Sequence, residues 1–220
     1  RAHVEAKKQA IKLLIGSRII FLTENNQSIE LILLCPCREA YAELSSLITC
    51  ARRRGKKGDY IAKLKDIKQL ITRCLAIWLP DNKISESTYQ NSVRQLQQIT
   101  HLFESRLWIG YQRALLAPDY QAYLICLKLA RYFELPLVAQ NRVLMHIKQR
   151  LKLQHCLTAI KHNQTIQTLG TELIINAEQH LRSLQQLENL YPKTLIDETV
   201  KIADRCQFSL DELRYEYPDE

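Results

Sequence analysis

Short apolar runs alternate with longer amphipathic segments along this chain. Runs of about four to eight apolar residues between turn signals are typical of buried strands, whereas a period near 3.6 residues indicates a helix. Strands that alternate with helices predict an α/β fold on a mainly parallel sheet, either open or barrel-like. We expect strands at residues 13–22, 29–34, 74–79, 106–111 and 137–139, and helices at residues 1–12, 38–54, 64–70, 85–104, 118–133, 151–162, 177–190 and 195–206.

Composition excludes several classes of protein. The 220 residues suffice for one barrel-sized domain, and 46% hydrophobic with 25% charged residues is ordinary for a globular protein. No run approaches the roughly 18 apolar residues of a membrane span, and we expect no signal peptide. Seven cysteines without a disulfide framework predict reduced thiols and a cytoplasmic location. Because the chain starts at Arg1 inside a predicted helix, we expect a fragment of a longer protein.

The stretch 135–150 contains the last predicted strand and the first candidate ligand, His146. Chemistry in α/β barrels sits at the carboxyl ends of strands, where His146 would lie. No Asp, Glu or Cys occurs within four residues of it, which favours a structural or solvent-exposed histidine. The chain also has no phosphate-binding glycine loop, no GxSxG motif and no histidine beside paired carboxylates. The residues by themselves therefore indicate no catalytic site.

Cations are concentrated at the end of the predicted helix 38–54. They are Arg52, Arg53, Arg54, Lys56 and Lys57. Cations stabilise a helix C-terminus, and the glycine that follows commonly ends a helix. The same side chains suit phosphate contacts, and the net charge of +8 is compatible with nucleic acid as a partner. Both interpretations, a helix end and a weak nucleic-acid-binding site, stay open.

Three segments near the C-terminus carry a family resemblance. Residues 176–183 (NAEQHLRS), 198–206 (ETVKIADRC) and 208–218 (FSLDELRYEYP) closely resemble bacterial error-prone DNA polymerases, which are related to the replicative polymerase III alpha subunit. The resemblance continues back to residues 14–17 (LIGS) and so covers nearly the whole chain. It identifies the chain as similar to the N-terminal polymerase-and-histidinol-phosphatase domain of that family.

That resemblance implies a fold and a division of the chain. The family's domain is a distorted seven-stranded β/α barrel. We therefore expect an incomplete, distorted barrel of this type followed by helices in residues 1–205, and the start of the connection to the polymerase core in residues 206–220. The missing start of the barrel would leave the strand at 13–22 unpaired or partly exposed, and such an edge favours aggregation.

The resemblance also locates the family's metal ligands. Arg18 stands where the family usually carries a Glu ligand, and Arg142 and Leu144 replace an Asp and a His of a later motif, of which His146 is the only ligand retained. A guanidinium has no lone pair for a cation and repels it. We expect no metal, no cofactor and no phosphoesterase activity in this chain. We also expect Arg18 and Arg142 to face one pocket, where a carboxylate or an anion pairs them unless both reach solvent.

The implied function belongs to a longer protein. It would be an error-prone DNA-directed DNA polymerase that uses Mg²⁺, acts on DNA and deoxynucleotides in replication and damage tolerance, and meets other damage-tolerance proteins, with no membrane partner. The 220 residues would be a structural module with a degenerate metal site. Two alternatives come from other classes of protein: a stand-alone metal-dependent phosphoesterase and a basic nucleic-acid-binding module. Metal analysis separates the first, and salt-dependent DNA binding separates the second.

Overall fold

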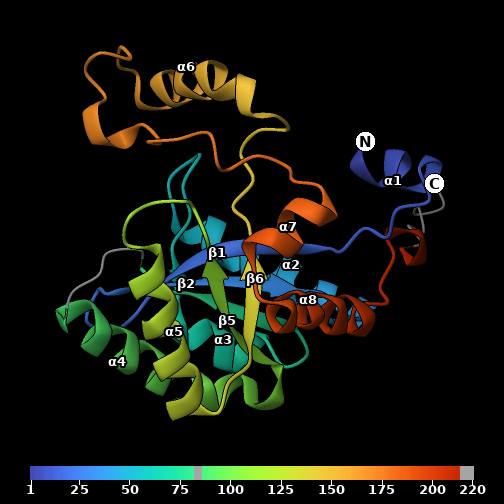
Figure 1. The fold of residues 1–220 in the computed structure, drawn as a ribbon. Coiled ribbons are helices and arrows are strands. Elements are labelled where there is room, and N and C mark those ends of the chain that lie inside the picture. Colours follow the sequence, from blue (N-terminus) through green and yellow to red (C-terminus); the bar gives the residue numbers. More distant parts are fainter. Residues whose placement is uncertain (82–85, 214–220) are drawn as a thin grey trace, which may run out of the picture.

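A six-stranded sheet forms the centre of the molecule in the computed structural model, which describes residues 1–81 and 86–213 (Figure 1). The strand order is β3-β1-β2-β4-β5-β6, in which β2 runs antiparallel to both neighbours and the other pairs are parallel. The strands are β1 (Gly16–Leu22), β2 (Ser28–Leu34), β3 (Ala62–Lys63), β4 (Leu75–Leu79), β5 (Leu107–Gln112) and β6 (Leu137–Gln140). The α/β prediction is confirmed as a class, and the described strands form an open sheet with β3 and β6 at its edges.

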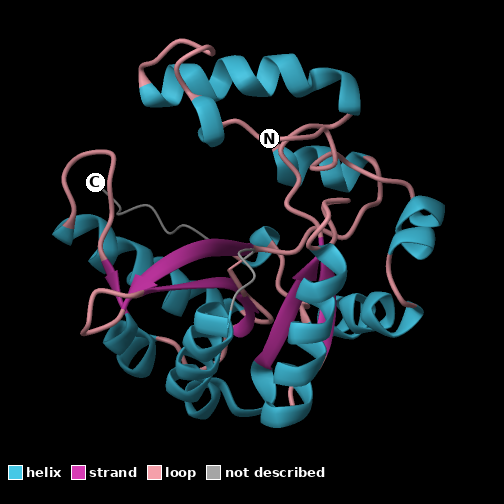
Figure 2. Cartoon of the chain, turned by 60° about the vertical axis from the view of Figure 1, so that its left-hand side comes forward, coloured by secondary structure: helices cyan, strands magenta, loops and turns pink. Residues whose placement is uncertain are grey.

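Helices surround this sheet, and one of them stands apart from it (Figure 2). The α-helices are α1 (Ala2–Lys8), α2 (Arg38–Arg54), α3 (Leu64–Leu70), α4 (Glu86–Phe103), α5 (Asp119–Phe133), α6 (Leu151–His162), α7 (Leu184–Leu190) and α8 (Lys193–Arg205). Short 3₁₀ turns are η1 (Glu104–Arg106), η2 (Lys148–Arg150), η3 (Gly170–Glu172) and η4 (Leu210–Glu212). Within the described ranges, no helix has the length and apolar character needed to cross a membrane.

The main core lies on one face of the sheet. Side chains alternate between faces along a strand, so Phe21, Leu31 and Trp78 point to the same side, where all three are fully buried. They belong to one hydrophobic cluster with Leu47 of α2 and Leu129 of α5. Burying side chains of this size supplies about 2 kcal/mol each, which makes this face the principal source of stability.

The opposite face is covered unevenly. Ile77, Trp108 and Val138 lie on it and form a smaller cluster with Ile202 of α8. Ile20 of β1 is on the same face but is 41% exposed, because α8 packs mainly against β6. This face therefore stays open at the β1–β2 end of the sheet.

β1 is nearly an edge strand, as expected for the residues 13–22. Only Phe21 and Leu22 pair with β3, although the Tyr60 hydroxyl also accepts a hydrogen bond from the Ile20 N–H at 3.1 Å. Among the described residues, the first part of β1 has no strand partner on this side. The expectation of a partly exposed edge is confirmed for that part.

Two predicted helix boundaries were placed too far out. The helix expected at 1–12 ends at Lys8, because Ala10 adopts a left-handed conformation with φ of 52° that interrupts a helix. The helix expected at 85–104 ends at Phe103, one residue early, and its predicted start at Ser85 lies outside the described residues. These differences are of the size that fraying and local turns commonly produce.

The helix prediction for 177–190 was wrong for its first half. Ser183 caps α7, because its Oγ accepts the Gln186 N–H at 3.3 Å while the Gln186 side chain accepts the Ser183 N–H at 3.0 Å. The helix therefore begins at Leu184. The preceding segment runs beside the end of the 135–150 stretch, where the Leu181 N–H donates to the Met145 carbonyl at 3.1 Å.

Candidate functional site

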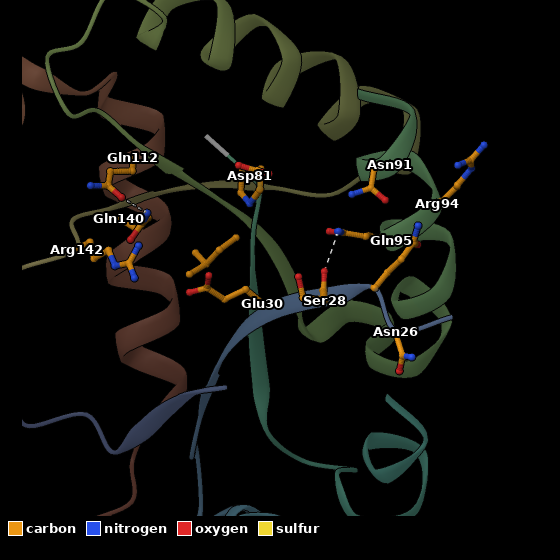
Figure 3. A pocket seen from close by; sticks show the side chains of 13 residues that line it. Asn26, Ser28, Glu30, Asp81, Asn91, Arg94, Gln95, Gln112, Gln140 and Arg142 are labelled. Carbon is orange, nitrogen blue, oxygen red and sulfur yellow. Dashed lines mark hydrogen bonds between the residues drawn. The ribbon is translucent and has the colours of Figure 1, made fainter. Parts of the chain in front are cut away.

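A polar cavity of about 730 Å³ lies at the carboxyl ends of β4, β5 and β6 (Figure 3). Leu79, Gln112 and Gln140 end these three parallel strands, and all three line the cavity. Ligands of α/β proteins bind at this end of parallel strands, where the following loops can carry function. The polar lining consists of Asn26, Gln27, Ser28, Glu30, Asp81, Asn91, Arg94, Gln95, Gln112, Gln140 and Arg142.

Three of the amide side chains in the cavity, Gln95, Gln112 and Gln140, are held by the protein. Gln140 Nε2 donates to Gln112 Oε1 at 3.2 Å, which joins the ends of β6 and β5. Gln95 accepts from Trp78 Nε1 at 3.0 Å and donates to a β2 carbonyl at 3.0 Å. Asn91 Oδ1 is different, since it is buried and has no hydrogen-bond partner within the described part of the chain. A buried amide oxygen without a partner is suited to accept a hydrogen bond from a ligand or water.

Arg18 lies on the open face of the sheet, opposite Ile32 of β2, and its charge interacts with that of Arg142. Arg18 Nε donates to Glu30 Oε1, and Glu30 lies opposite Ile20 in the β1–β2 register. Burial lowers the pKa of Arg18, and the positive charge of Arg142 lowers it further. Burial also lowers the pKa of Arg142. Both arginines are exposed to solvent, and Arg142 lines the cavity whereas Arg18 does not. That both face one pocket therefore stays a prediction, and the Arg18–Glu30 ion pair is the part of it that the structure shows.

The cavity lining contains two cations, Arg94 and Arg142, and two carboxylates, Glu30 and Asp81. Arg142 is exposed to solvent. It lines the cavity and approaches Glu30 in Figure 3, yet it makes no hydrogen bond or ion pair with a described residue. Arg18 is already paired with that carboxylate, so Glu30 cannot neutralise both guanidiniums. The Arg142 guanidinium therefore has no ion pair with a described residue, and such a group at the cavity suits an anion better than a cation.

Leu144 and His146, like Arg18, lie outside the cavity lining. Leu144 is 42% exposed, and its N–H donates to the Gln179 carbonyl at 2.8 Å. His146 is exposed to solvent, in line with its lack of neighbouring carboxylates. No three His, Cys, Asp or Glu side chains of the described ranges lie close enough together to hold a metal ion. The structure thus places Arg142 in the cavity lining and Arg18, Leu144 and His146 outside it.

The cations at the end of α2 and directly after it divide into two groups. Arg52 donates to the Gly58 carbonyl at 2.9 Å and lies over the Tyr60 ring, so it fixes the loop that follows the helix. Arg54 forms an ion pair with Asp66, whose side chain is 1% exposed. These two arginines have structural roles. The remaining exposed cations, without an ion pair to a described residue, are Arg53, Lys56 and Lys57.

Several residues that line the cavity were not predicted from the sequence. Gln112 and Gln140 directly follow the apolar runs at 106–111 and 137–139, so the rule that sites form at strand ends could have indicated them. Glu30 lies inside an apolar strand and Asn91 inside a helix rich in Gln and Ser, where nothing local marks a site. Their place in the cavity depends on strand register and helix packing.

Error-prone DNA polymerases of several bacteria match the entire chain. The protein of Vibrio vulnificus strain CMCP6 is 44% identical over 222 aligned residues, that of Saccharophagus degradans 43% over 222, and that of Teredinibacter turnerae 42% over 220. The chain is homologous to error-prone DNA polymerases. The resemblance predicted from the sequence is therefore confirmed. No family model matches the chain.

The matched region is a small part of these polymerases. The chain spans about a fifth of the length of the curated relatives it matches, 21% for Vibrio vulnificus and 20% for the other two, at their N-terminal end. The similarity extends over 100% of this chain, so it includes the strands that form the cavity and helix α6. About four fifths of the length of each of these relatives therefore lies outside the matched region.

Proposed function

We propose that the chain is the N-terminal module of an error-prone DNA-directed DNA polymerase that acts in the cytoplasm in DNA replication and damage tolerance. Identity of 42% to 44% along the entire chain is the observation that carries this proposal. The polymerase would bind DNA and deoxynucleotides, with Mg²⁺ held by carboxylates outside these 220 residues. The module itself would be an incomplete barrel of the polymerase-and-histidinol-phosphatase type whose metal site has degenerated.

A hybrid polymerase tests this proposal. In it, this chain replaces the matching N-terminal fifth of the Vibrio vulnificus enzyme. We expect the hybrid polymerase to extend a primer on an intact template and past an abasic site, since a compatible module keeps the remaining chain folded. The control is the same enzyme with that fifth deleted, which we expect to lose extension. An inactive hybrid would count against the proposed function.

The absence of a metal is a prediction of its own. We expect the purified chain to retain less than about 0.1 zinc, manganese or iron per molecule after dialysis, because guanidiniums occupy two ligand positions. Elemental analysis by mass spectrometry measures this content. About one metal per chain, together with hydrolysis of a phosphate ester that a chelator abolishes, would favour the stand-alone phosphoesterase instead.

The cavity would hold an anion in place of the cation. Arg142 faces it without a partner among the described residues, and Arg is well suited to bidentate contacts with phosphate. We expect phosphate at about ten times its dissociation constant to raise the melting temperature by about 3 °C at constant ionic strength. Arg142→Ala should lose this rise, whereas the exposed Arg53→Ala should keep it. An equal rise in wild type and Arg142→Ala would contradict the anion site.

A further inference from the structure

Helix α6 presents an apolar face to solvent. Leu153, Leu157 and Ile160 are 48%, 51% and 75% exposed, and their spacing places them on one side of the helix together with the exposed Cys156. Ala159, on the opposite side, is buried. A surface helix of an isolated domain normally turns its polar side outward, and α6 has the reverse arrangement. Figure 2 shows this helix at the top, separated from the sheet.

Helix α6 and the chain on either side of it in sequence carry cations but no carboxylate side chain. Residues 135–171 contain no Asp and no Glu. Lys152 and Lys161 flank the apolar stripe on α6, and Arg150 precedes the helix, whereas Lys148 is paired with Glu178. Two copies of α6 placed face to face would bring like charges together, which disfavours a symmetric dimer through this helix. An apolar centre with a basic margin instead fits a surface that has an apolar centre and acidic margin.

We propose that the outward face of α6 docks onto the part of the polymerase chain that the relatives carry beyond the matched fifth. This inference rests on the proposed function. The relatives match all of this chain, α6 included, and about four fifths of their length lies outside the match. The same polypeptide therefore supplies a large surface that could cover the apolar face of α6. The contact is between α6 and an acidic, apolar-centred surface of that chain. Exposed apolar stripes of this kind mark interaction sites in proteins.

Cys156 reports directly on this contact. It lies within the apolar face and is the exposed member of the free cysteines, whereas Cys50 on α2 is half-buried and far from α6 in sequence. We expect iodoacetamide to alkylate Cys156 roughly tenfold more slowly in the hybrid polymerase than in the isolated 220-residue chain, because docking excludes the reagent. The rate at Cys50 should be the same in both. Peptide mass spectrometry reads the two sites separately.

A matched pair of substitutions separates docking from other effects. Leu157→Gln places a polar group in the face, and Leu124→Gln does the same at a 45% exposed leucine of α5. In the hybrid polymerase, Leu157→Gln should return the alkylation rate of Cys156 to that of the isolated chain, and Leu124→Gln should leave it slow. Both variants should melt at the wild-type temperature as isolated chains, since neither side chain is in the core.

The outcomes that overturn the inference differ from those that overturn the function. An active hybrid polymerase in which Cys156 reacts as fast as in the isolated chain overturns the docking and leaves the proposed function intact. A hybrid without primer extension counts against the function. Protection of Cys156 in the isolated chain, by high chain concentration or by vesicles of anionic phospholipid, would assign the face to a second copy or a membrane and overturn the docking.

Discussion

Replacing Tyr191 by alanine is expected to lower the free energy of unfolding by about 4 kcal/mol. Tyr191 lies between α7 and α8, is 3% exposed, and meets the Tyr111 ring edge-on at a centroid distance of 6.0 Å. Removing a buried aromatic ring leaves a cavity, because the close-packed sheet and helices around it relax only in part. Urea unfolding followed by circular dichroism at pH 7 measures the loss.

The phenylalanine variant separates the ring from its hydroxyl. Tyr191 Oη donates to the Gln140 carbonyl at 2.8 Å and accepts from the Arg113 N–H at 3.0 Å. Tyr191→Phe keeps the packing and leaves these two backbone groups without a partner, so we expect a loss of about 1 to 2 kcal/mol. Because Gln140 lines the cavity, both variants should also weaken the response to phosphate. An alanine variant no less stable than Tyr191→Phe would show that the ring contributes little.

The strands were predictable from sequence because their signals are local. The runs at 74–79 and 106–111 are apolar on both faces, which only buried strands require, and the structure places β4 and β5 within one residue of them. The polar turn between β1 and β2 likewise fixed a hairpin. The helix prediction failed for residues 177–183, which are irregular. Their backbone hydrogen bonds go to Leu144 and Met145, more than 30 residues earlier, and no local pattern can indicate such contacts.

The candidate site was predictable only in part. Arg18 and Arg142 were matched through the family resemblance, which depends on motifs and not on composition or periodicity. Glu30, the partner of Arg18, was not predicted, since the β1–β2 register sets which side chains stand beside Arg18. A shift of that register by one residue would move Glu30 to the main core face. The charge balance of the cavity is therefore a property of strand pairing.

Replacing Asp66 by alanine is expected to lower the free energy of unfolding by about 3 kcal/mol, at the lower end for a broken buried ion pair. The Asp66 carboxylate pairs with Arg54 and accepts the Lys63 N–H at 2.9 Å, which caps α3. Its loss leaves the Arg54 cation without a partner, although the 35% exposure of that side chain allows water to offset part of the cost. Arg53→Ala, one residue away in the same basic run, is the control and should cost less than about 0.5 kcal/mol.

The same pair predicts a dependence on pH. Burial acts to raise the pKa of Asp66, but hydrogen bonds from Arg54 and the Lys63 N–H outweigh it, so that the folded pKa lies below the usual value. A lowered folded pKa stabilises the fold at every pH above the unfolded pKa of about 3.9 and loses this contribution as pH falls through the folded value. The stability difference between wild type and Asp66→Asn should therefore be full above about pH 5 and shrink below pH 4. A difference that does not change from pH 7 to pH 3 would mean that the ion pair contributes no free energy, and Arg54 would then be as available for phosphate as Arg53.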